Sequence, residues 1–353
     1  MSEYWLEIGE AGVWVAAAVC LWLIVCNRWV MNWTDGPLKT ATLVGGLLLM
    51  TGSALWLGSA HLSARWHAVP LVVLGLVVVG ELRRFALRRA ASAEVPVSVS
   101  PSARSRWSPN TTTDLAVIRH LASAPCLRGD RLRVVQLSDL HVTDQVPYDY
   151  YVSVLETAAR QEPDLLILTG DFVSSRRRMD LVEELLRDRL EARLGVFGVL
   201  GNHDYWTDSL AVRRVLERVG VQLLRGECRR LTLRDGATLQ LCGTEQPWGV
   251  TLHADAVREA DFTLVLSHNP DNIYELASMG VSAVFGGHYH GGQFRIPGLG
   301  AFVVPSRYGR RFDRGRFRIG NTDLFVSSGV GVDMPPLRIY CRPDILVVDF
   351  MGS

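Results

Sequence analysis

Two hydrophobic patterns divide the chain. In its first 80 residues, long apolar runs without acidic or basic side chains, apart from His61 and His67, follow one another at Ala11–Cys26, Thr40–Leu62 and Trp66–Gly80. From about Leu132 onward, the apolar runs are short and alternate with amphipathic stretches. The first pattern is typical of membrane-spanning helices, and the second of an α/β domain.

The first two apolar runs are long enough, or nearly so, to cross a bilayer as helices. The third run holds only 15 residues, so it would cross with little tilt, thin the bilayer or lie re-entrant. Seven of the ten tryptophans lie at or before Trp66, several near the ends of the runs, where tryptophan anchors helices at the membrane interface. We therefore predict a helical membrane region of two to three spans over residues 1–90, in preference to buried helices of a soluble domain.

The charges that flank these runs bear on export and orientation. A cleaved signal peptide is disfavoured, because the N-terminus carries Glu3, Glu7 and Glu10 instead of basic residues. Arginines cluster directly after the third run, at Arg83, Arg84, Arg88 and Arg89. With three spans, the positive-inside rule predicts a multi-pass protein of the inner membrane with the following domain in the cytoplasm. With two spans the topology would reverse. The cluster also suits contact with anionic lipid head groups.

Composition adds a linker and excludes one class of partner. Ser, Pro, Thr and Ala dominate from Ala91 to Asp114, which predicts a flexible linker over residues 91–129 before a domain at 130–353. The net charge of +1 gives no sign of nucleic acid as a partner. The six cysteines are scattered without a C-x-x-C pair, which favours reduced, mostly buried thiols in a reducing compartment.

Strand and helix patterns alternate in the second part of the chain. The predicted helices are Tyr148–Arg160 and Met179–Leu194. The predicted strands are Leu132–Leu137, Leu165–Leu168, Gly195–Leu200, Phe262–Leu266, Val281–Phe285 and Asp344–Phe350. Alternation of this kind indicates an α/β core with a largely parallel sheet.

Five polar blocks each follow one of these strands. They are Asp139-Leu-His141, Gly170-Asp171, Gly201-Asn202-His203-Asp204, Ser267-His268 and Gly287-His288-Tyr289-His290. Because ligand sites of α/β sheets lie at the carboxyl ends of strands, we expect the blocks to converge. Carboxylate, amide and imidazole ligands without cysteine suit two divalent cations, with Mn the first expectation and Fe or Zn also possible. Two such ions about 3.5–4 Å apart are a common apparatus for hydrolysing phosphate esters.

The ordered blocks resemble those of the calcineurin-like metallophosphoesterases, from about Arg131 to Phe350. The resemblance implies an α/β sandwich following the helical membrane segment. It implies one metal held by Asp139, His141 and His290, a second held by Asn202, His268 and His288, and Asp171 as the bridge between them. His203 would contact the phosphate or protonate the leaving oxygen, and Asp204 would orient His203 through a carboxylate–imidazole hydrogen bond. Asp204 as a simple helix cap is the alternative.

Two arginines are candidates for substrate binding. Arg176 opens an Arg176-Arg177-Arg178 run just after Asp171 and suits a second phosphate or lipid head groups. A solvated start of a helix is the favoured alternative for this run. Arg307 follows the last block, in Pro305-Ser306-Arg307-Tyr308, and is a candidate to face the site.

The sequence after the last ligand block bears on which substrate is hydrolysed. The tail pattern GHYHGGQFRIPGLG followed by VPSRYGRRF is similar to the membrane-attached bacterial branch of the family, some of whose members look like UDP-2,3-diacylglucosamine pyrophosphatases of lipid A synthesis. We therefore expect a membrane-anchored hydrolase of a phosphoanhydride or phosphodiester, with a phosphorylated or nucleotide-linked lipid as substrate. The alternatives are a general phosphodiesterase or protein phosphatase located at the membrane, and an inactive sensor or scaffold, against which the complete ligand set argues.

Overall fold

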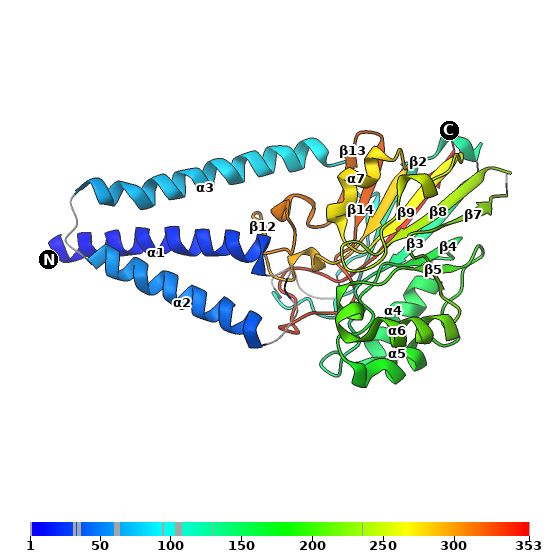
Figure 1. Ribbon diagram of the computed structural model, residues 1–353, viewed down its shortest axis with the longest axis horizontal. Coiled ribbons are helices and arrows are strands. Elements are labelled where there is room, and N and C mark those ends of the chain that lie inside the picture. The colour runs from blue at the N-terminus through cyan, green and yellow to red at the C-terminus, as the bar shows by residue number, and fades with distance from the viewer. Residues whose placement is uncertain are drawn as a thin grey trace. The chain divides into compact units, whose positions relative to one another are not determined.

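The chain forms two compact units. One contains Met1–Ala90 and Phe302–Arg311, and the other contains Ala91–Ala301 and Phe312–Ser353. The computed structural model in Figure 1 describes residues 2–30, 33, 37–59, 64–93, 95–102, 108–128, 130–234 and 236–352.

The first unit is built from three helices, α1 (Ser2–Arg28), α2 (Pro37–Ser59) and α3 (Ala64–Ala91). The windows Gly9–Cys26 and Pro37–Ser59 are long and apolar enough to cross a membrane, by length and composition alone. The third apolar run forms the first part of a continuous helix of 28 residues that includes the arginine cluster, so it is not a separate short element. Within the described residues, α1 and α2 thus meet the length and composition expected of a span.

The second unit contains two mixed sheets. The first has the order β1-β2-β15-β3-β4-β5-β6. Its strands are β1 (Ser98–Val99), β2 (Ala116–Ser123), β3 (Arg131–Leu137), β4 (Leu165–Leu168), β5 (Val196–Gly198), β6 (Gln222–Leu223) and β15 (Asp344–Met351). Strands β3 to β6 run parallel, whereas β15 pairs antiparallel with β3 and parallel with β2. In this sheet the predicted parallel arrangement is therefore limited to four strands that end at the β6 edge.

The second sheet has the order β13-β14-β10-β9-β8-β7. Its strands are β7 (Cys228–Thr232), β8 (Thr238–Thr244), β9 (Phe262–Ser267), β10 (Ala283–Gly286), β13 (Gly315–Ile319) and β14 (Thr322–Val326). Strands β8, β9, β10 and β14 are parallel, and the two edge strands are antiparallel to their neighbours. A separate two-stranded sheet joins β11 (Arg295–Ile296) to β12 (Gly300–Ala301).

Alternation along the central strands explains the layers. In β3, Val134 belongs to a buried cluster that includes Leu264 and Phe325 of the second sheet, whereas Val135 belongs to a cluster that includes residues of the helices. Successive strand residues point to opposite faces, so β3 is covered on both sides. The covering helices are α4 (Tyr148–Ala159), α5 (Met179–Leu186) and α6 (Asn202–Arg218); Figure 1 shows them together beneath the first sheet, while α7 (Ile273–Ser278) lies by the second.

Residues 91–129 are not the linker that their composition predicts. Strand β2 lies within them and pairs in parallel with β15 over its whole length, from Ala116 opposite Asp344 to Ser123 opposite Met351. The composition of the segment gives little strand signal, and β2 pairs only with β1 and the distant C-terminal strand. The predicted helix Met179–Leu194 is also too long, since α5 ends at Leu186.

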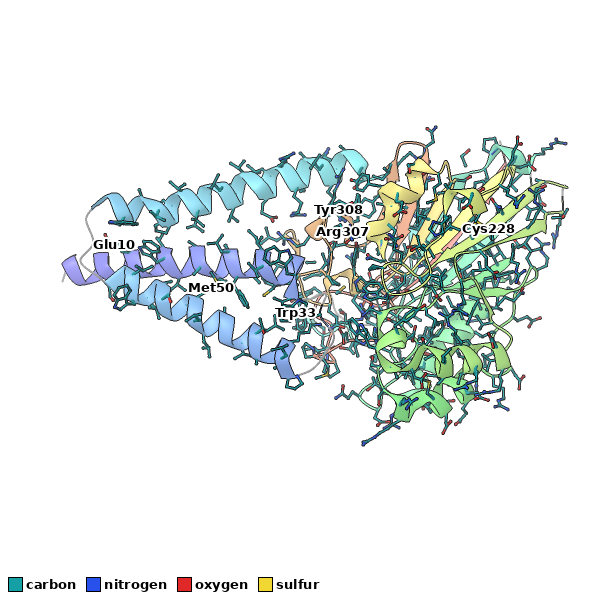
Figure 2. The ribbon with its side chains drawn as sticks, in the orientation of Figure 1. Glu10, Trp33, Met50, Cys228, Arg307 and Tyr308 are labelled. Atoms are coloured by element: carbon teal, nitrogen blue, oxygen red, sulfur yellow. A yellow bond between two sulfur atoms is a disulfide. The ribbon has the colours of Figure 1, made fainter. Side chains whose placement is uncertain are left out.

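The cysteines correct a second prediction. Cys228 and Cys242 form a disulfide between β7 and β8, where they are directly opposed in the antiparallel register; Figure 2 labels Cys228. The expectation that all cysteines are reduced is therefore wrong for this pair. The spacing of the cysteines in the sequence does not predict this disulfide, because the register of the hairpin is what brings the two side chains together. Cys20, Cys26, Cys126 and Cys341 are not part of a disulfide among the described residues.

His120 on β2 makes the stability of the second unit depend on pH. Its side chain is 1% exposed, and neither ring nitrogen has a hydrogen-bond partner among the described residues. Burial, followed by the charge of Arg316, lowers the pKa of His120 from 6.5 to about 4. The unfolded chain therefore binds this proton more readily, and the stability contributed by neutral His120 above pH 6.5 is lost as the pH falls toward 4.

We expect the free energy of unfolding to fall by about 2 kcal/mol between pH 7 and pH 5 because of this one group. Urea unfolding of the wild-type chain and of His120→Phe at the two pH values measures it. Between the two pH values, the free energy of unfolding of the variant should fall by about 2 kcal/mol less than that of the wild type. An equal fall in both proteins would contradict the assignment.

Candidate metal centre

The residues of the five polar blocks meet at the carboxyl ends of strands from both sheets. Asp139 and His141 follow β3, Asp171 follows β4, and Asn202 and His203 open α6 directly after β5. His268 follows β9, and His288 and His290 follow β10, in the second sheet. The strand-end placement predicted from sequence is present, but the side chains converge from two facing sheets and not from the edge of one.

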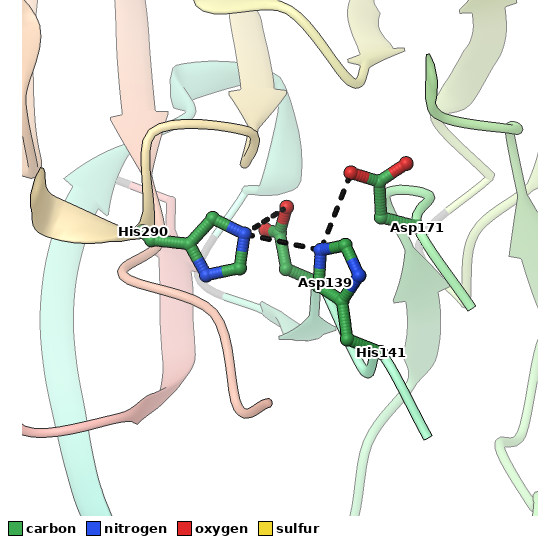
Figure 3. A group of neighbouring side chains, drawn as sticks. All are labelled: Asp139, His141, Asp171 and His290. Atoms are coloured by element: carbon green, nitrogen blue, oxygen red, sulfur yellow. Dashed lines mark hydrogen bonds and ion pairs between the residues drawn. The ribbon is translucent and has the colours of Figure 1, made fainter. Parts of the chain in front are cut away.

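Four buried side chains form the first group, Asp139, His141, Asp171 and His290 (Figure 3). One ligand atom from each lies within 4.8 Å of the others. The Nε2 atom of His141 is 3.1 Å from Nε2 of His290 and 3.4 Å from Oδ2 of Asp171. Nε2 of His290 is 3.6 Å from Oδ1 of Asp139. Two imidazoles and two carboxylates thus surround one point.

A second buried group shares Asp171 with the first. Asp171, His268 and His288 bring their ligand atoms within 4.8 Å of one another. Nε2 of His268 lies 3.2 Å from Oδ2 of Asp171 and 3.0 Å from Oδ1 of Asn202, which adds an amide oxygen. Membership in both groups puts the Asp171 carboxylate in the position of a bridge.

Two hydrogen bonds leave imidazole Nε2 atoms available to a metal. Nδ1 of His141 lies 2.6 Å from Ser174 Oγ, and Nδ1 of His268 lies 2.6 Å from the carbonyl oxygen of Thr169. The carbonyl can only accept, so Nδ1 of His268 carries a proton and Nε2 is the nitrogen left to bind a metal. Nε2 of His288 is buried and makes no hydrogen bond within the described part of the chain, although the ring packs against Trp248.

The backbone at these ligands is strained. Five of them have a positive φ: Asp139 (53°), His141 (40°), Asp171 (57°), His288 (65°) and His290 (50°). Left-handed backbone costs a residue with a Cβ about 1–3 kcal/mol, and such residues cluster where function requires a fixed geometry. Glycines complete the arrangement, because a Cβ at Gly201 would collide with the Asp171 carboxylate, and one at Gly287 with the side chains of Ser138 and Asp139.

The electrostatics favour bound positive charge. Burial opposes ionisation of Asp171, yet the charges of His268 and His203 hold its pKa well below 3.8. Burial likewise opposes protonation of His141 and His268, but the neighbouring carboxylates, Asp171 first, raise the pKa of each histidine to about 9. Without a cation, the histidines thus take up protons that balance the buried carboxylates. Two carboxylates, one amide oxygen and four imidazoles fit two divalent cations.

Asp204 does not make the hydrogen bond to His203 that the resemblance implies. Its carboxylate instead accepts backbone N–H bonds at 2.8–3.3 Å, and the donors are Asp171, Phe172, Val173 and Gly201. Burial, followed by the charge of Asp171, raises the pKa of Asp204 to about 7. Asp204 therefore ties the loop after β4 to the start of α6.

His203 lies beside the first metal group. Its ring meets that of His141 edge-on, with 4.6 Å between centroids. Its Nε2 is 3.8 Å from a carboxylate oxygen of Asp333, which sequence reasoning missed because Asp333 lies far along the chain from the motif. An imidazole next to the ligands is placed to donate a proton or a hydrogen bond to a bound phosphate.

Two tryptophans near the ligands were also missed. Trp206 lies with its ring 4.8 Å from that of His203, and Trp248 lies 5.0 Å from His288 and 5.9 Å from His268. Trp206 is three positions after His203 on α6, a proximity that could have indicated it. Trp248 comes from the loop between β8 and β9, for which the sequence offers no local signal.

The arginines predicted to bind substrate are not among the metal ligands. Arg176 is exposed and forms an ion pair with Asp208, which agrees with the solvated-helix alternative. Arg307 belongs to the segment Phe302–Arg311 of the helical unit.

A third arginine, Arg338, holds the loops behind the ligands. It is fully buried and donates hydrogen bonds to the carbonyl oxygens of Gly331 (2.6 Å), Ser328 (2.7 Å) and His290 (3.2 Å). Its Nη2 atom also lies 3.3 Å from Nδ1 of His290. One guanidinium thus joins a metal ligand to the loop after β14.

We expect Arg338→Met to lower the free energy of unfolding by about 3 kcal/mol or more, because each buried acceptor left unpaired costs about 1–3 kcal/mol. Urea unfolding of the metal-free protein measures this change. Arg160→Met, at a surface-exposed arginine, is the control and should change the value by less than about 0.5 kcal/mol. Equal stability of the two variants would contradict the assigned role.

Comparison with known proteins agrees with this geometry. The sequence profile of the family described as calcineurin-like phosphoesterase matches residues 132–292. The uncharacterized metallophosphoesterase YkuE of Bacillus subtilis is 29% identical over 62% of this chain and 78% of its own. Phosphodiesterase YaeI of Escherichia coli is 26% identical over 62% and 82%. UDP-2,3-diacylglucosamine pyrophosphatase LpxG of Chlamydia trachomatis is 29% identical over 47% and 65%.

Proposed function

Because this chain carries a calcineurin-like metallophosphoesterase domain and is a metal-dependent hydrolase of phosphoric esters or pyrophosphates, we propose that it is anchored in a membrane and acts on a lipid-linked phosphoanhydride or phosphodiester. The observation that carries the proposal is a pair of buried ligand groups sharing Asp171, in a chain with two helices apolar enough to span a bilayer.

Each residue of the centre has a distinct task in this proposal. Asp139, His141 and His290 hold one cation, Asn202, His268 and His288 hold the other, and Asp171 joins them. When bound, the cations stabilise charge on the phosphoryl oxygens and lower the pKa of a coordinated water. Asn202 contributes a neutral oxygen, which avoids adding negative charge.

Three further side chains act on the substrate and its surroundings. His203 donates a hydrogen bond to the phosphate or a proton to the leaving oxygen. Trp206 packs against the ring of His203 and Trp248 against that of the ligand His288, and both limit the access of water to the centre.

The specific substrate that we propose is UDP-2,3-diacylglucosamine, with Mn as the metal. Two observations support it: the similarity to a relative named for that pyrophosphatase activity, and the apolar helices that would bring the domain to a lipid surface. The second candidate is a general phosphodiesterase located at the membrane, which the similarity to a phosphodiesterase of Escherichia coli supports.

A hydrolysis panel separates these functions. Purified full-length protein with Mn would be given UDP-2,3-diacylglucosamine, bis-p-nitrophenyl phosphate and a phosphopeptide. We expect UMP and a lipid 1-phosphate from the first, loss of activity with a chelator and its recovery with Mn. Hydrolysis of the second without UMP release would establish the general phosphodiesterase, and phosphopeptide turnover alone a protein phosphatase. No turnover by the metal-loaded protein would leave only the inactive sensor or scaffold.

The side of the membrane is a separate proposal. Arg83, Arg84, Arg88 and Arg89 directly follow the apolar part of α3 and favour the cytoplasmic side of the inner membrane. The disulfide between Cys228 and Cys242 favours an oxidising compartment instead. We propose that α3 crosses the bilayer as a third span and that the catalytic unit lies on the cytoplasmic side, since charge next to a membrane helix acts directly on its insertion. Digestion of the catalytic unit by external protease in intact spheroplasts would overturn it.

A further inference from the structure

A pocket of about 720 Å³ lies within the helical unit. Its walls come from α1, α3 and the segment Phe302–Arg311, which the chain supplies between β12 and β13. The segment is fastened to α3 by an ion pair from Arg310 to Glu81 and by a hydrogen bond of 3.1 Å from Arg88 to the carbonyl oxygen of Arg311. None of the metal ligands lines this pocket, so it is distinct from the site described above.

One part of the pocket wall is apolar. Leu21 and Ile24 of α1, Leu76 of α3 and Phe302 line it. These side chains are 40%, 42%, 67% and 45% exposed, so an apolar molecule could cover them. Burying such surface against a hydrocarbon chain is favourable, because it removes apolar area from water. The wall therefore suits an acyl chain better than a small polar solute.

The rest of the lining is strongly basic. Five arginines contribute to it, namely Arg83, Arg84, Arg307, Arg310 and Arg311, against one acidic residue, Glu81. Glu81 pairs with both Arg84 and Arg310, at 2.8 Å in the first case. Arginines thus outnumber acidic residues five to one in the lining. Figure 2 labels Arg307 and Tyr308 of this segment. Guanidinium groups bind phosphate oxygens in bidentate geometry, so the basic part suits a phosphate group.

We propose that this pocket binds an anionic phospholipid of the surrounding bilayer, with its phosphate against the arginines and an acyl chain along the apolar wall. The combination of surfaces carries the inference, because a free phosphate would leave the apolar wall uncovered and a lipid without net negative charge would be attracted less strongly to the arginine-rich part. The proposal rests on the proposed membrane position of the helices but not on hydrolytic activity. Bound lipid would fasten Phe302–Arg311 to α1 and α3.

Lipid retention by the full-length protein tests the proposal. The protein would be purified in detergent, mixed with equal amounts of phosphatidylglycerol and phosphatidylcholine, and examined by native mass spectrometry. We expect wild type to retain phosphatidylglycerol preferentially. Arg83→Gln combined with Arg307→Gln, two exposed positions, should lower that retention about tenfold. Arg89→Gln, at an exposed arginine of the same helix outside the pocket, is the matched control and should retain the lipid.

Two further arms identify what is bound. Leu76→Trp, which fills the apolar part at an exposed position, should reduce lipid retention while leaving the protein folded by circular dichroism. Excess inorganic phosphate should not displace the lipid, and displacement would indicate a simple anion site. Equal retention by wild type and the double variant, or an equal loss in Arg89→Gln, would overturn the proposal. Because no outcome depends on turnover, the result is separate from that of the hydrolysis panel.

Discussion

Asp171→Asn is expected to abolish most activity and to change how many metal ions the protein holds. Asp171 is the one side chain common to both ligand groups, and its Oδ2 lies 3.4 Å from Nε2 of His141 and 3.2 Å from Nε2 of His268. Asparagine keeps the shape but removes the charge that two cations would share. Losing even one neutral donor to a developing oxyanion costs about 10²–10³-fold, so we expect a fall in kcat of roughly 10³-fold or more.

The measurement pairs kinetics with metal analysis. Wild type, Asp171→Asn and the control Asp180→Asn, at an exposed position of α5, would be assayed on bis-p-nitrophenyl phosphate. Metal content would be measured on the same samples. We expect about two ions in wild type and the control, and fewer in Asp171→Asn. Full activity of Asp171→Asn would contradict the bridging role of Asp171 and the assignment of two metal ions.

The ligand blocks could be predicted from sequence because their signals are local. A short apolar strand followed at once by Asp, Asn or His predicts where the side chain goes, since parallel strands present their carboxyl ends together. Asp171 after β4 and His268 after β9 follow this rule. The rule does not say which sheet a strand joins. The distribution of ligands over two facing sheets was therefore missed.

What the sequence could not predict depends on long-range partners. Arg338 bonds to the carbonyl of His290 across 48 positions, Trp248 reaches His288 from a different loop, and β2 is defined by pairing with β15 at the other end of the domain. The bridge between Cys228 and Cys242 likewise depends on the register of two strands. None of these contacts can be recognised from the spacing of residues in the sequence, because each contact is created by tertiary packing alone.

Asp204 shows how a motif can be identified while its role is misassigned. Adjacent positions in Gly201-Asn202-His203-Asp204 suggest a contact between neighbouring side chains. On the first turn of α6, however, His203 and Asp204 point in different directions, because successive helical residues are about 100° apart. The carboxylate turns toward the amides of the loop after β4, and the imidazole turns toward His141. Replacement of Asp204 and replacement of His203 should therefore have different effects on stability and on activity.

At pH 8, where Asp204 is mostly ionised, Asp204→Asn should lower both stability and activity. The asparagine NH₂ would face backbone N–H groups that now donate to a carboxylate oxygen, and each buried donor left unpaired costs about 1–3 kcal/mol. We expect the free energy of unfolding to fall by about 3 kcal/mol. We expect kcat/KM to fall about 10–100-fold, as for other partners that position ligands.

His203→Asn is the matched comparison, because it removes the neighbouring side chain of the same turn. It should lower kcat by about 10²-fold or more while changing the free energy of unfolding by less than about 1 kcal/mol. Urea unfolding of the metal-free proteins and steady-state kinetics with Mn would be measured on both variants. If Asp204→Asn lost activity without losing stability, the carboxylate would act through His203 after all, as the motif alone suggests.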